Sequence, residues 1–270
     1  MTDIHPSAII DKTAQLGDGV TIGPGCLIGP DVVIGDGCEL KFHVAVYPGT
    51  RMGKNNVCFA GSVIGEEPQI MGQRNPKTEL IIGDNNLFRE CVTLHRGSPK
   101  SSGKTILGSN LYLMAYCHVG HDAAVEDNVV MCNGCQIGGH CLVERNSWLS
   151  GYSGMHQFTT FGRFAYSAAY SCITADVPPF VKVQGANPSE IRGLNTPGLT
   201  RGGITPESLA AIEKAYRTLF MRRGGKTLAQ ALAEVESQDG IDENVRYLVD
   251  SLKRTMQHRF RRYREQFRAH

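Results

Sequence analysis

The sequence has few aromatic residues and no long apolar stretch. Phe, Trp and Tyr make up 7% of its 270 residues, so we expect a core of small aliphatic side chains. No window reaches the roughly 18 apolar residues of a membrane span, and no signal-like apolar stretch follows Met1. The formal charge of +2 shows no excess that would indicate a nucleic-acid partner. Its nine cysteines are odd in number and scattered, which indicates reduced thiols in a cytoplasmic protein.

Glycine is abundant, at 31 residues, and it accompanies a repeat of six residues. Every sixth position from 10 to 64 is apolar, as are eleven of the twelve such positions from 107 to 173. The residue two positions earlier is usually small. The first run is Ile10, Leu16, Ile22, Ile28, Ile34, Leu40, Val46, Met52, Cys58 and Ile64.

A period of six fits neither an α-helix nor simple strand alternation. It fits short strands joined by tight turns, with one aliphatic and one small residue pointing inward in each hexad. Three hexads close a triangular coil of about 18 residues, and the coils stack at strand spacing. The sequence therefore predicts a left-handed parallel β-helix of hexapeptide repeats.

Two segments interrupt the repeat, at 66–80 and 97–104, and we expect both to be loops that leave the coil. Binding residues often lie on such loops. The repeat ends near the motif DVPPF at 176–180. We therefore expect a β-helix domain over 1–185 and a helical C-terminal domain over 186–270.

Helix signals follow in the second part. Thr205 and Thr227 are candidate N-caps, and Gln230 stands where a capping box requires it. An apolar stripe predicts a third helix over 243–267. Residues 251–270 hold seven Lys and Arg against one Glu, so this helix is basic.

Several histidines are spaced at about one coil. His140 follows His121 by slightly more than one coil, and His156 follows His140 by slightly less than one coil. His95 reaches the same edge of the prism once the surplus residues of the loop at 97–104 are discounted, and His118 falls beside it. We expect the five to line one edge, with His140 and His156 stacked below His121.

Two chemistries suit such an edge. Three histidines from stacked coils can bind zinc, as in the gamma-class carbonic anhydrases, but the spacing of His118 and His121 matches their pattern poorly. A single histidine can instead remove a proton from a hydroxyl or amine near neutral pH. Asp122 could orient His121, provided that a turn brings the two neighbouring side chains together.

The chain resembles the UDP-N-acetylglucosamine acyltransferases of lipid A biosynthesis over almost its whole length. The motifs that carry the resemblance are CHVGHD at 117–122, GGH at 138–140, MHQF at 155–158, TLHRG at 93–97, DVPPF at 176–180 and RRGGKTL at 222–228. The resemblance implies transfer of a 3-hydroxyacyl group from acyl carrier protein to the 3-position of a nucleotide sugar. It also implies a homotrimer, with no metal and no other cofactor.

The resemblance assigns a role to each matching residue. His121 matches the general base, Asp122 its orienting acid, and the backbone N–H of Gly139 the oxyanion donor. The substrate-binding matches are His95, His118, His140, His156, Gln157, Gln69, Asn195 and Arg201. The acidic carrier protein would suit the basic C-terminal helix, although a solvated helix face explains the same charges.

Some positions depart from the family pattern. Ile70 and Gly72 stand where the family has an aspartate and a lysine, and Thr200 and Gly202 stand in its basic Lys-Arg-Arg-Gly motif. Ala168 replaces a usual glycine in the region that measures the acyl chain. The alternatives are thus a different acceptor, such as a 3-amino sugar nucleotide, or a shorter acyl chain. A zinc lyase and a non-catalytic scaffold are further alternatives.

Overall fold

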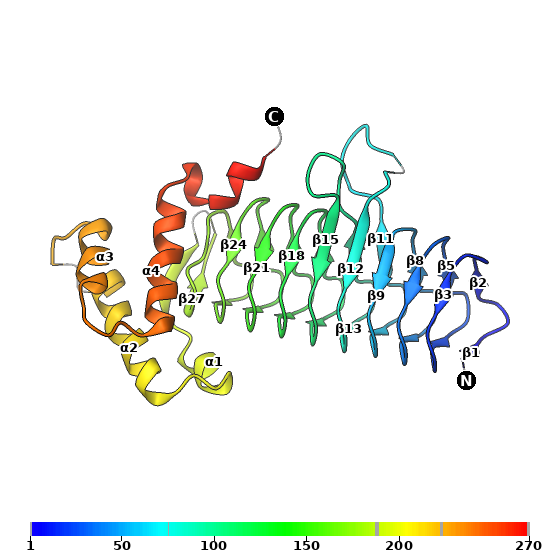
Figure 1. Cartoon of the computed structure of the whole chain (residues 1–270), viewed down its shortest axis with the longest axis horizontal. Helices are drawn as coiled ribbons and strands as arrows, with labels where there is room; N and C mark the ends of the chain where they lie inside the picture. Colours follow the sequence, from blue (N-terminus) through cyan, green and yellow to red (C-terminus); the bar gives the residue numbers. More distant parts are fainter. Residues whose placement is uncertain (1, 75, 187–188, 222–223, 269–270) are drawn as a thin grey trace.

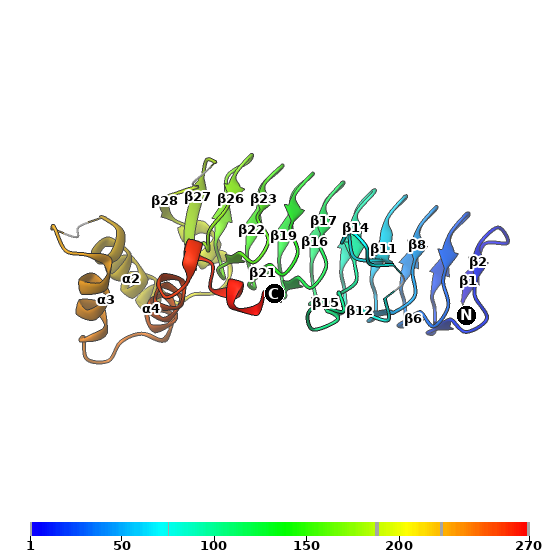
Figure 2. The ribbon, with the colours of Figure 1, turned by 90° about the horizontal axis from the view of Figure 1, so that it is seen from above.

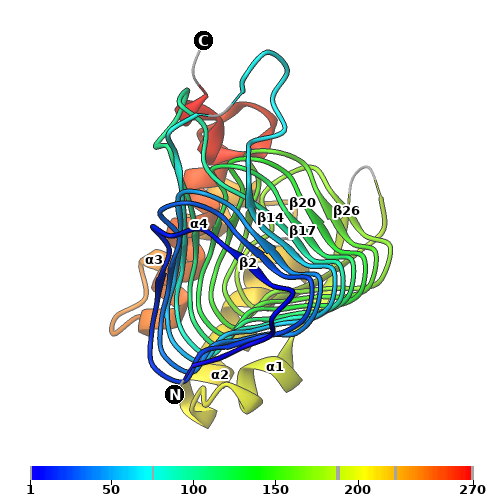
Figure 3. The same ribbon diagram turned by 90° about the vertical axis from the view of Figure 1, so that its right-hand side faces the viewer.

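The computed structural model describes residues 2–74, 76–186, 189–221 and 224–268. Its larger part is the expected left-handed parallel β-helix, a triangular prism with a helical part at one end (Figure 1). Figure 3 looks along the prism and shows the three flat faces. Each face is one sheet, called A, B or C here.

Through the coils, each strand pairs with the strand three places along the chain, and this order changes at the last two strands of sheet A. Sheet A contains β1 (Asp3–Ile4), β4 (Thr21–Ile22), β7 (Glu39–Leu40), β10 (Val57–Cys58), β13 (Leu87–Phe88), β16 (Tyr112–Leu113), β19 (Val130–Met131), β22 (Trp148–Leu149), β25 (Tyr166–Ser167), β27 (Val181–Gln184) and β28 (Glu190–Leu194). Sheet B contains β2 (Ile9–Ile10), β5 (Leu27–Ile28), β8 (Ala45–Val46), β11 (Val63–Glu66), β14 (Thr93–His95), β17 (His118–Val119), β20 (Gln136–Ile137), β23 (Gly154–Met155) and β26 (Cys172–Ile173). Sheet C contains β3 (Gln15–Leu16), β6 (Val33–Ile34), β9 (Thr50–Met52), β12 (Glu79–Ile82), β15 (Lys104–Leu107), β18 (Ala124–Val125), β21 (Leu142–Val143) and β24 (Thr160–Phe161).

The pairing register explains why the six-residue count predicts the core. Ile22 pairs with Leu40, and Val119 with Ile137, in each case exactly three hexads further along the chain. The aliphatic hexad positions therefore stack inside the prism, where Ile22 is 1% exposed and Val119 is 0% exposed. Ile10, at the open first coil, is only partly buried, because no earlier coil covers it.

Cysteine takes the small inward position on several coils. Cys117 Sγ donates to the Cys132 carbonyl at 3.1 Å, and Cys135 Sγ to the Ser150 carbonyl at 3.1 Å. Cys132 and Cys135 are close in sequence, yet both are free thiols and do not form a disulfide. Cys172, in contrast, is exposed.

Both predicted loops leave the coil. The first lies between β11 and β12, so that Val57 pairs with Leu87, well beyond the spacing of three hexads. The second lies between β14 and β15, and it likewise lengthens the interval between the paired residues Thr93 and His118. The parallel pairing resumes after each loop, so the stacked core is continuous.

The chain then leaves the coil through the antiparallel pair of β27 and β28. The elements that follow are α1 (Thr196–Arg201), α2 (Pro206–Tyr216), the π-helical turn η1 (Arg217–Met221), α3 (Leu228–Glu236), α4 (Glu243–Met256) and the 3-10 turns η2 (Arg259–Arg261) and η3 (Tyr263–Phe267). The domain boundary expected between 185 and 186 falls in the segment joining β27 to β28, and stays a prediction.

The helix caps agree with the sequence signals. The Thr205 hydroxyl accepts the Ser208 N–H, and Thr227 forms a full capping box with Gln230. The third helix is shorter than the sequence predicts, because α4 ends at Met256. Phe260 has a φ of 61° inside η2, so the chain turns away from the helix axis there. None of the helices in the described ranges is both long and apolar enough to cross a membrane.

Candidate active site

His121 and Asp122 lie at the corner where the chain passes from β17 in sheet B to β18 in sheet C. Asp122 has a φ of 59°, a left-handed conformation that supplies the turn the sequence required. His121 Nδ1 and Asp122 Oδ2 are therefore 2.8 Å apart. The two adjacent residues form a hydrogen-bonded pair at the edge of the prism.

The carboxylate of Asp122 is held from several sides. Its side chain is 1% exposed, and it accepts the Ser98 N–H at 3.0 and 3.1 Å. Its own N–H donates to Thr105 Oγ1 at 2.8 Å. Burial acts to raise the pKa of Asp122, but hydrogen bonds from His121 and Ser98 outweigh it and hold the pKa below its usual value. Asp122 is thus an ionised acceptor at neutral pH.

This acceptor determines the tautomer of His121. An ionised carboxylate only accepts hydrogen bonds, so the proton of neutral His121 lies on Nδ1 and the lone pair on Nε2. Gly139 lies on the next coil, and a Cβ there would be 2.8 Å from both Nε2 and Cε1 of His121. The Gly139 N–H donates to no described residue. A proton acceptor and an unpaired N–H donor therefore lie together at this corner.

His140 completes the corner on the next coil. Its Nε2 is 3.8 Å from Asp122 Oδ2, and its ring stands edge-on to His121 with centroids 5.1 Å apart. On its other side it stacks on Phe158 at 4.4 Å. Burial lowers the pKa of His140 more than the nearby Asp122 raises it, so the ring is neutral at pH 7.

His95 lies on β14, one coil earlier in sheet B, and His118 lies on β17, the strand that leads to His121. His95 Nδ1 contacts the Glu67 carbonyl at 2.6 Å, and His118 Nδ1 contacts Thr93 Oγ1 at 2.9 Å. Burial lowers the pKa of His95, and burial followed by the charges of neighbouring histidines lowers the pKa of His118 to about 4. The Glu67 contact ties the first loop to the site, and the exposed Gln69 lies slightly further along the same loop.

His156 and Gln157 are exposed at the same edge, after β23. The expectation that His156 stacks below His140 is wrong. The residue stacked on His140 is Phe158, which lies one full coil after it. His156 Nδ1 instead contacts the Gln157 carbonyl at 2.9 Å and Arg262 Nη1 at 3.1 Å.

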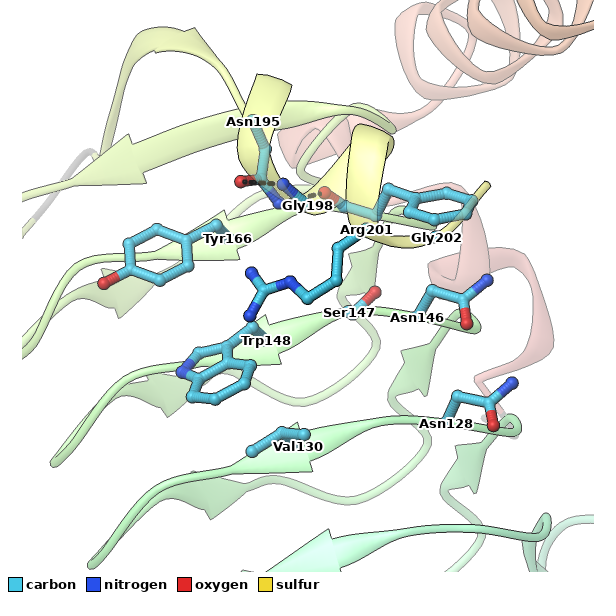
Figure 4. A pocket seen from close by; sticks show the side chains of 11 residues that line it. Asn128, Val130, Asn146, Ser147, Trp148, Tyr166, Asn195, Gly198, Arg201 and Gly202 are labelled. Atoms are coloured by element: carbon cyan, nitrogen blue, oxygen red, sulfur yellow. Dashed lines mark hydrogen bonds between the residues drawn. The ribbon is translucent and has the colours of Figure 1, made fainter. Parts of the chain in front are cut away.

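Asn195 and Arg201 line a different surface (Figure 4). Together with Trp148 and Tyr166 of sheet A they border a pocket of about 360 Å³ beside α1. The Asn195 side chain caps α1 and donates to the Phe164 carbonyl at 2.9 Å. Arg201 lies over the Trp148 ring at 5.8 Å. Within one chain, these two residues do not join the histidine edge.

The nitrogen and oxygen ligand atoms of His121, Asp122 and His140 lie within 4.8 Å of one another. They are a possible metal-binding group by residue type. However, His121 Nδ1 and Asp122 already bind each other, and Ser98 occupies both carboxylate oxygens. The arrangement therefore suits a proton relay better than a cation.

The sequence reasoning missed the residues that support this corner. Ser98 and Thr105 hold Asp122 from the second loop and from β15. Arg264 Nε donates to the His140 carbonyl at 2.7 Å. Two features of the sequence pointed to these segments, the loop that interrupts the repeat and the basic charge of the C-terminal segment. Neither feature identifies which residues contact Asp122 or His140.

The fold and two family models together define an acyltransferase of the hexapeptide-repeat class. A family model described as bacterial transferase hexapeptide (six repeats) matches residues 1–35 and 13–48. A second, described as UDP N-acetylglucosamine O-acyltransferase, domain 2, matches residues 176–260.

The relatives extend this match over almost the whole chain. The acyl-[acyl-carrier-protein]–UDP-N-acetylglucosamine O-acyltransferase of Stutzerimonas stutzeri is 37% identical, over 94% of this chain and 97% of its own. That of Stenotrophomonas maltophilia (strain K279a) is 38% identical with the same coverage. The crystal structure of the Francisella novicida UDP-N-acetylglucosamine acyltransferase superposes with a TM-score of 0.87 at 34% identity, over 93% of this chain and 91% of its own. The chain belongs to the UDP-N-acetylglucosamine O-acyltransferase family.

Proposed function

We propose that this enzyme moves an acyl group, such as a 3-hydroxyacyl group, from acyl carrier protein to the 3-position of UDP-N-acetylglucosamine, the first step of lipid A biosynthesis. The His121–Asp122 pair carries this proposal, because its Nδ1–Oδ2 hydrogen bond of 2.8 Å leaves Nε2 as the proton acceptor. The family membership supports the choice of donor and acceptor. We also propose a cytoplasmic location, which suits the free cysteines.

The residues then have defined roles. His121 Nε2 removes the proton from the acceptor hydroxyl, whose oxygen forms a bond to the thioester carbonyl carbon. The carbonyl oxygen becomes negatively charged, and the Gly139 N–H donates to it. When the C–S bond breaks, the proton on His121 passes to the leaving sulfur. Asp122 stabilises the transient imidazolium, as in other histidine-based acyl transfer.

The remaining matched residues are proposed to bind substrates. His95, His118, His140, His156 and Gln157 line the edge beside His121. Gln69 lies on the loop that Glu67 attaches to this edge.

We propose that the site is completed between copies of a homotrimer. Asn195 and Arg201 belong to the proposed binding set, but they lie by sheet A and α1, away from the corner of His121. In a trimer, a neighbouring copy would bring its own Arg201 surface to this edge. Mixed assemblies test this: His121→Ala and Arg201→Ala chains, each inactive alone, should regain activity when unfolded together and reassembled. No recovery in assembled mixtures would contradict a shared site.

The residues proposed to contact the acceptor lie on the first loop. Ile70 and Gly72 replace the polar residues of the family pattern, and a Cβ added at Gly72 would meet no described atom within 4 Å. Arg74 and Lys77 on the same loop are exposed and can offer charge to a phosphate. A 3-amino sugar nucleotide as acceptor is therefore the second candidate.

One experiment separates these possibilities. The protein is incubated with acyl carrier proteins of several chain lengths and with UDP-N-acetylglucosamine or its 3-amino analogue, and product masses are measured. We expect acylation of UDP-N-acetylglucosamine, lost by orders of magnitude in His121→Ala while the fold is kept. Near wild-type turnover in that variant would contradict the mechanism. Bound zinc in stoichiometric amount, with activity lost on chelation, would favour the lyase alternative.

A further inference from the structure

The C-terminal arm, defined here as Arg259–Arg268, returns to the prism after α4. Figure 1 shows the red end of the chain lying over the last coils, and Figure 2 shows it reaching toward β21. It thus passes along the edge that carries His140 and His156.

Hydrogen bonds attach this arm to the last coil. Asp176 Oδ2 accepts the Tyr263 N–H at 2.9 Å and the Thr255 hydroxyl at 3.2 Å. The Asp176 N–H donates to the Arg261 carbonyl at 2.8 Å. Arg264 Nε donates to the His140 carbonyl at 2.7 Å. The arm is therefore anchored on both sides of Arg262.

The Arg262 guanidinium is buried by this attachment. Arg262 is 8% exposed, and its Nη2 forms an ion pair with Glu265 at 2.6 Å. Its Nη1 donates to the Thr174 carbonyl at 3.2 Å and lies 3.1 Å from His156 Nδ1. Glu265 and Thr174 thus hold the Arg262 side chain in place, independently of its contact with His156.

His156 Nδ1 has two neighbours with opposite requirements. The Gln157 carbonyl, at 2.9 Å, can only accept, so it requires a proton on Nδ1. Arg262 Nη1 can only donate, so it requires a lone pair on Nδ1. One nitrogen cannot meet both requirements at once. The charged donor makes the stronger hydrogen bond and also opposes a second positive charge on the ring.

We propose that Arg262 is a positioning residue that holds His156 in its neutral Nε2–H tautomer. Nε2 has no partner among the described residues, and the ring is exposed at the proposed substrate edge. His156 therefore presents a hydrogen-bond donor to the substrates, whereas His121 presents an acceptor. The role in catalysis rests on the proposed function, but the tautomer itself does not.

Nitrogen-15 NMR of the full chain labelled at histidine and arginine tests the assignment. The His156 signals are identified by their loss in His156→Gln. We expect an unprotonated Nδ1, a protonated Nε2, and a scalar coupling between Arg262 Nη1 and His156 Nδ1 across the hydrogen bond. A protonated Nδ1 in the wild type would overturn the proposal without any Arg262 variant.

Variants then test the cause. In Arg262→Met we expect the proton to move to Nδ1, toward the Gln157 carbonyl, and kcat/KM to fall about three- to tenfold, the range for one hydrogen bond. Arg262→Lys, which keeps a charged donor, should restore the tautomer in part. Arg261→Met removes the same charge from the adjacent, exposed residue and should change neither quantity. An unchanged His156 tautomer in a folded Arg262→Met protein would overturn the role of Arg262.

The two proposals fail in different ways. If the acyltransferase reaction is wrong, no substrate pair is turned over, yet the tautomer of His156 is still observed by NMR. If the Arg262 proposal is wrong, the tautomer differs while His121 remains essential for turnover.

Discussion

Gly139→Ala tests the geometry of the proposed base with a single methyl group. The new Cβ would lie 2.8 Å from Nε2 and Cε1 of His121, closer than real contacts allow. Carbon atoms in ordinary contact are about 3.5 Å or more apart, so the ring must retreat by roughly 0.7 Å. Gly139 has no positive φ, so the alanine backbone itself carries no strain.

The displaced ring affects turnover more than stability. A misplacement of about 1 Å in a reacting group costs around a hundredfold in rate, or about 2.7 kcal/mol of barrier. We therefore expect kcat to fall about a hundredfold in Gly139→Ala. The Gly139 N–H is retained, so the loss reports the position of His121 and not the oxyanion donor.

The assay is steady-state acyl transfer with the product measured by mass, together with thermal unfolding of each variant. Gly154→Ala is the control, because a Cβ added there would meet no described atom within 4 Å and the residue lies on β23, one coil after β20. We expect this control to keep wild-type kcat. A Gly139→Ala enzyme with kcat within about threefold of wild type would refute the reasoning.

Three further predictions follow from buried groups. In Asp122→Asn, an amide N–H faces His121 Nδ1 and drives the proton to Nε2, so kcat should fall about 10²- to 10⁴-fold. Asp127→Asn, whose amide oxygen can still accept the Ser109 N–H, should keep wild-type kcat. The pKa of His118 is about 4 in the fold against about 6.5 unfolded, so its contribution to stability is present above pH 6.5 and is lost as the pH falls to 4. Urea unfolding over that range should show a loss that is about 3 kcal/mol smaller in His118→Gln than in the wild type. Phe161→Ala removes the ring of a fully buried core residue and should lower the free energy of unfolding by about 3–5 kcal/mol in the same assay.

Each of these predictions has a contradicting result. Equal activity of the Asp122→Asn and wild-type enzymes would remove Asp122 from the mechanism. An unchanged pH slope in His118→Gln would mean that another group titrates. A loss below about 1 kcal/mol in Phe161→Ala would mean that neighbouring coils collapse into the space.

The expected helix over 243–267 shows where local pattern misleads. The apolar stripe continues to Tyr263, but α4 ends at Met256. The Tyr263 N–H binds Asp176 on the last coil, far back in the sequence, and draws the chain off the helix axis. Because Asp176 lies outside the segment, the helix propensity of the segment cannot predict this contact.

The sequence by itself determined the coil and the position of the proposed base. A repeat of six needs no distant information, because each hexad places its aliphatic residue over the equivalent residue of the next coil. His121 and Asp122 are neighbours in the chain, so a single turn suffices to join them.

Only the tertiary structure decided the surroundings of that base. Ser98 reaches Asp122 because a loop folds back over the edge, and Arg262 reaches His156 from the far end of the chain. A hydrogen bond or a ring contact depends on distance in space, which spacing along the chain predicts only while the repeat is unbroken.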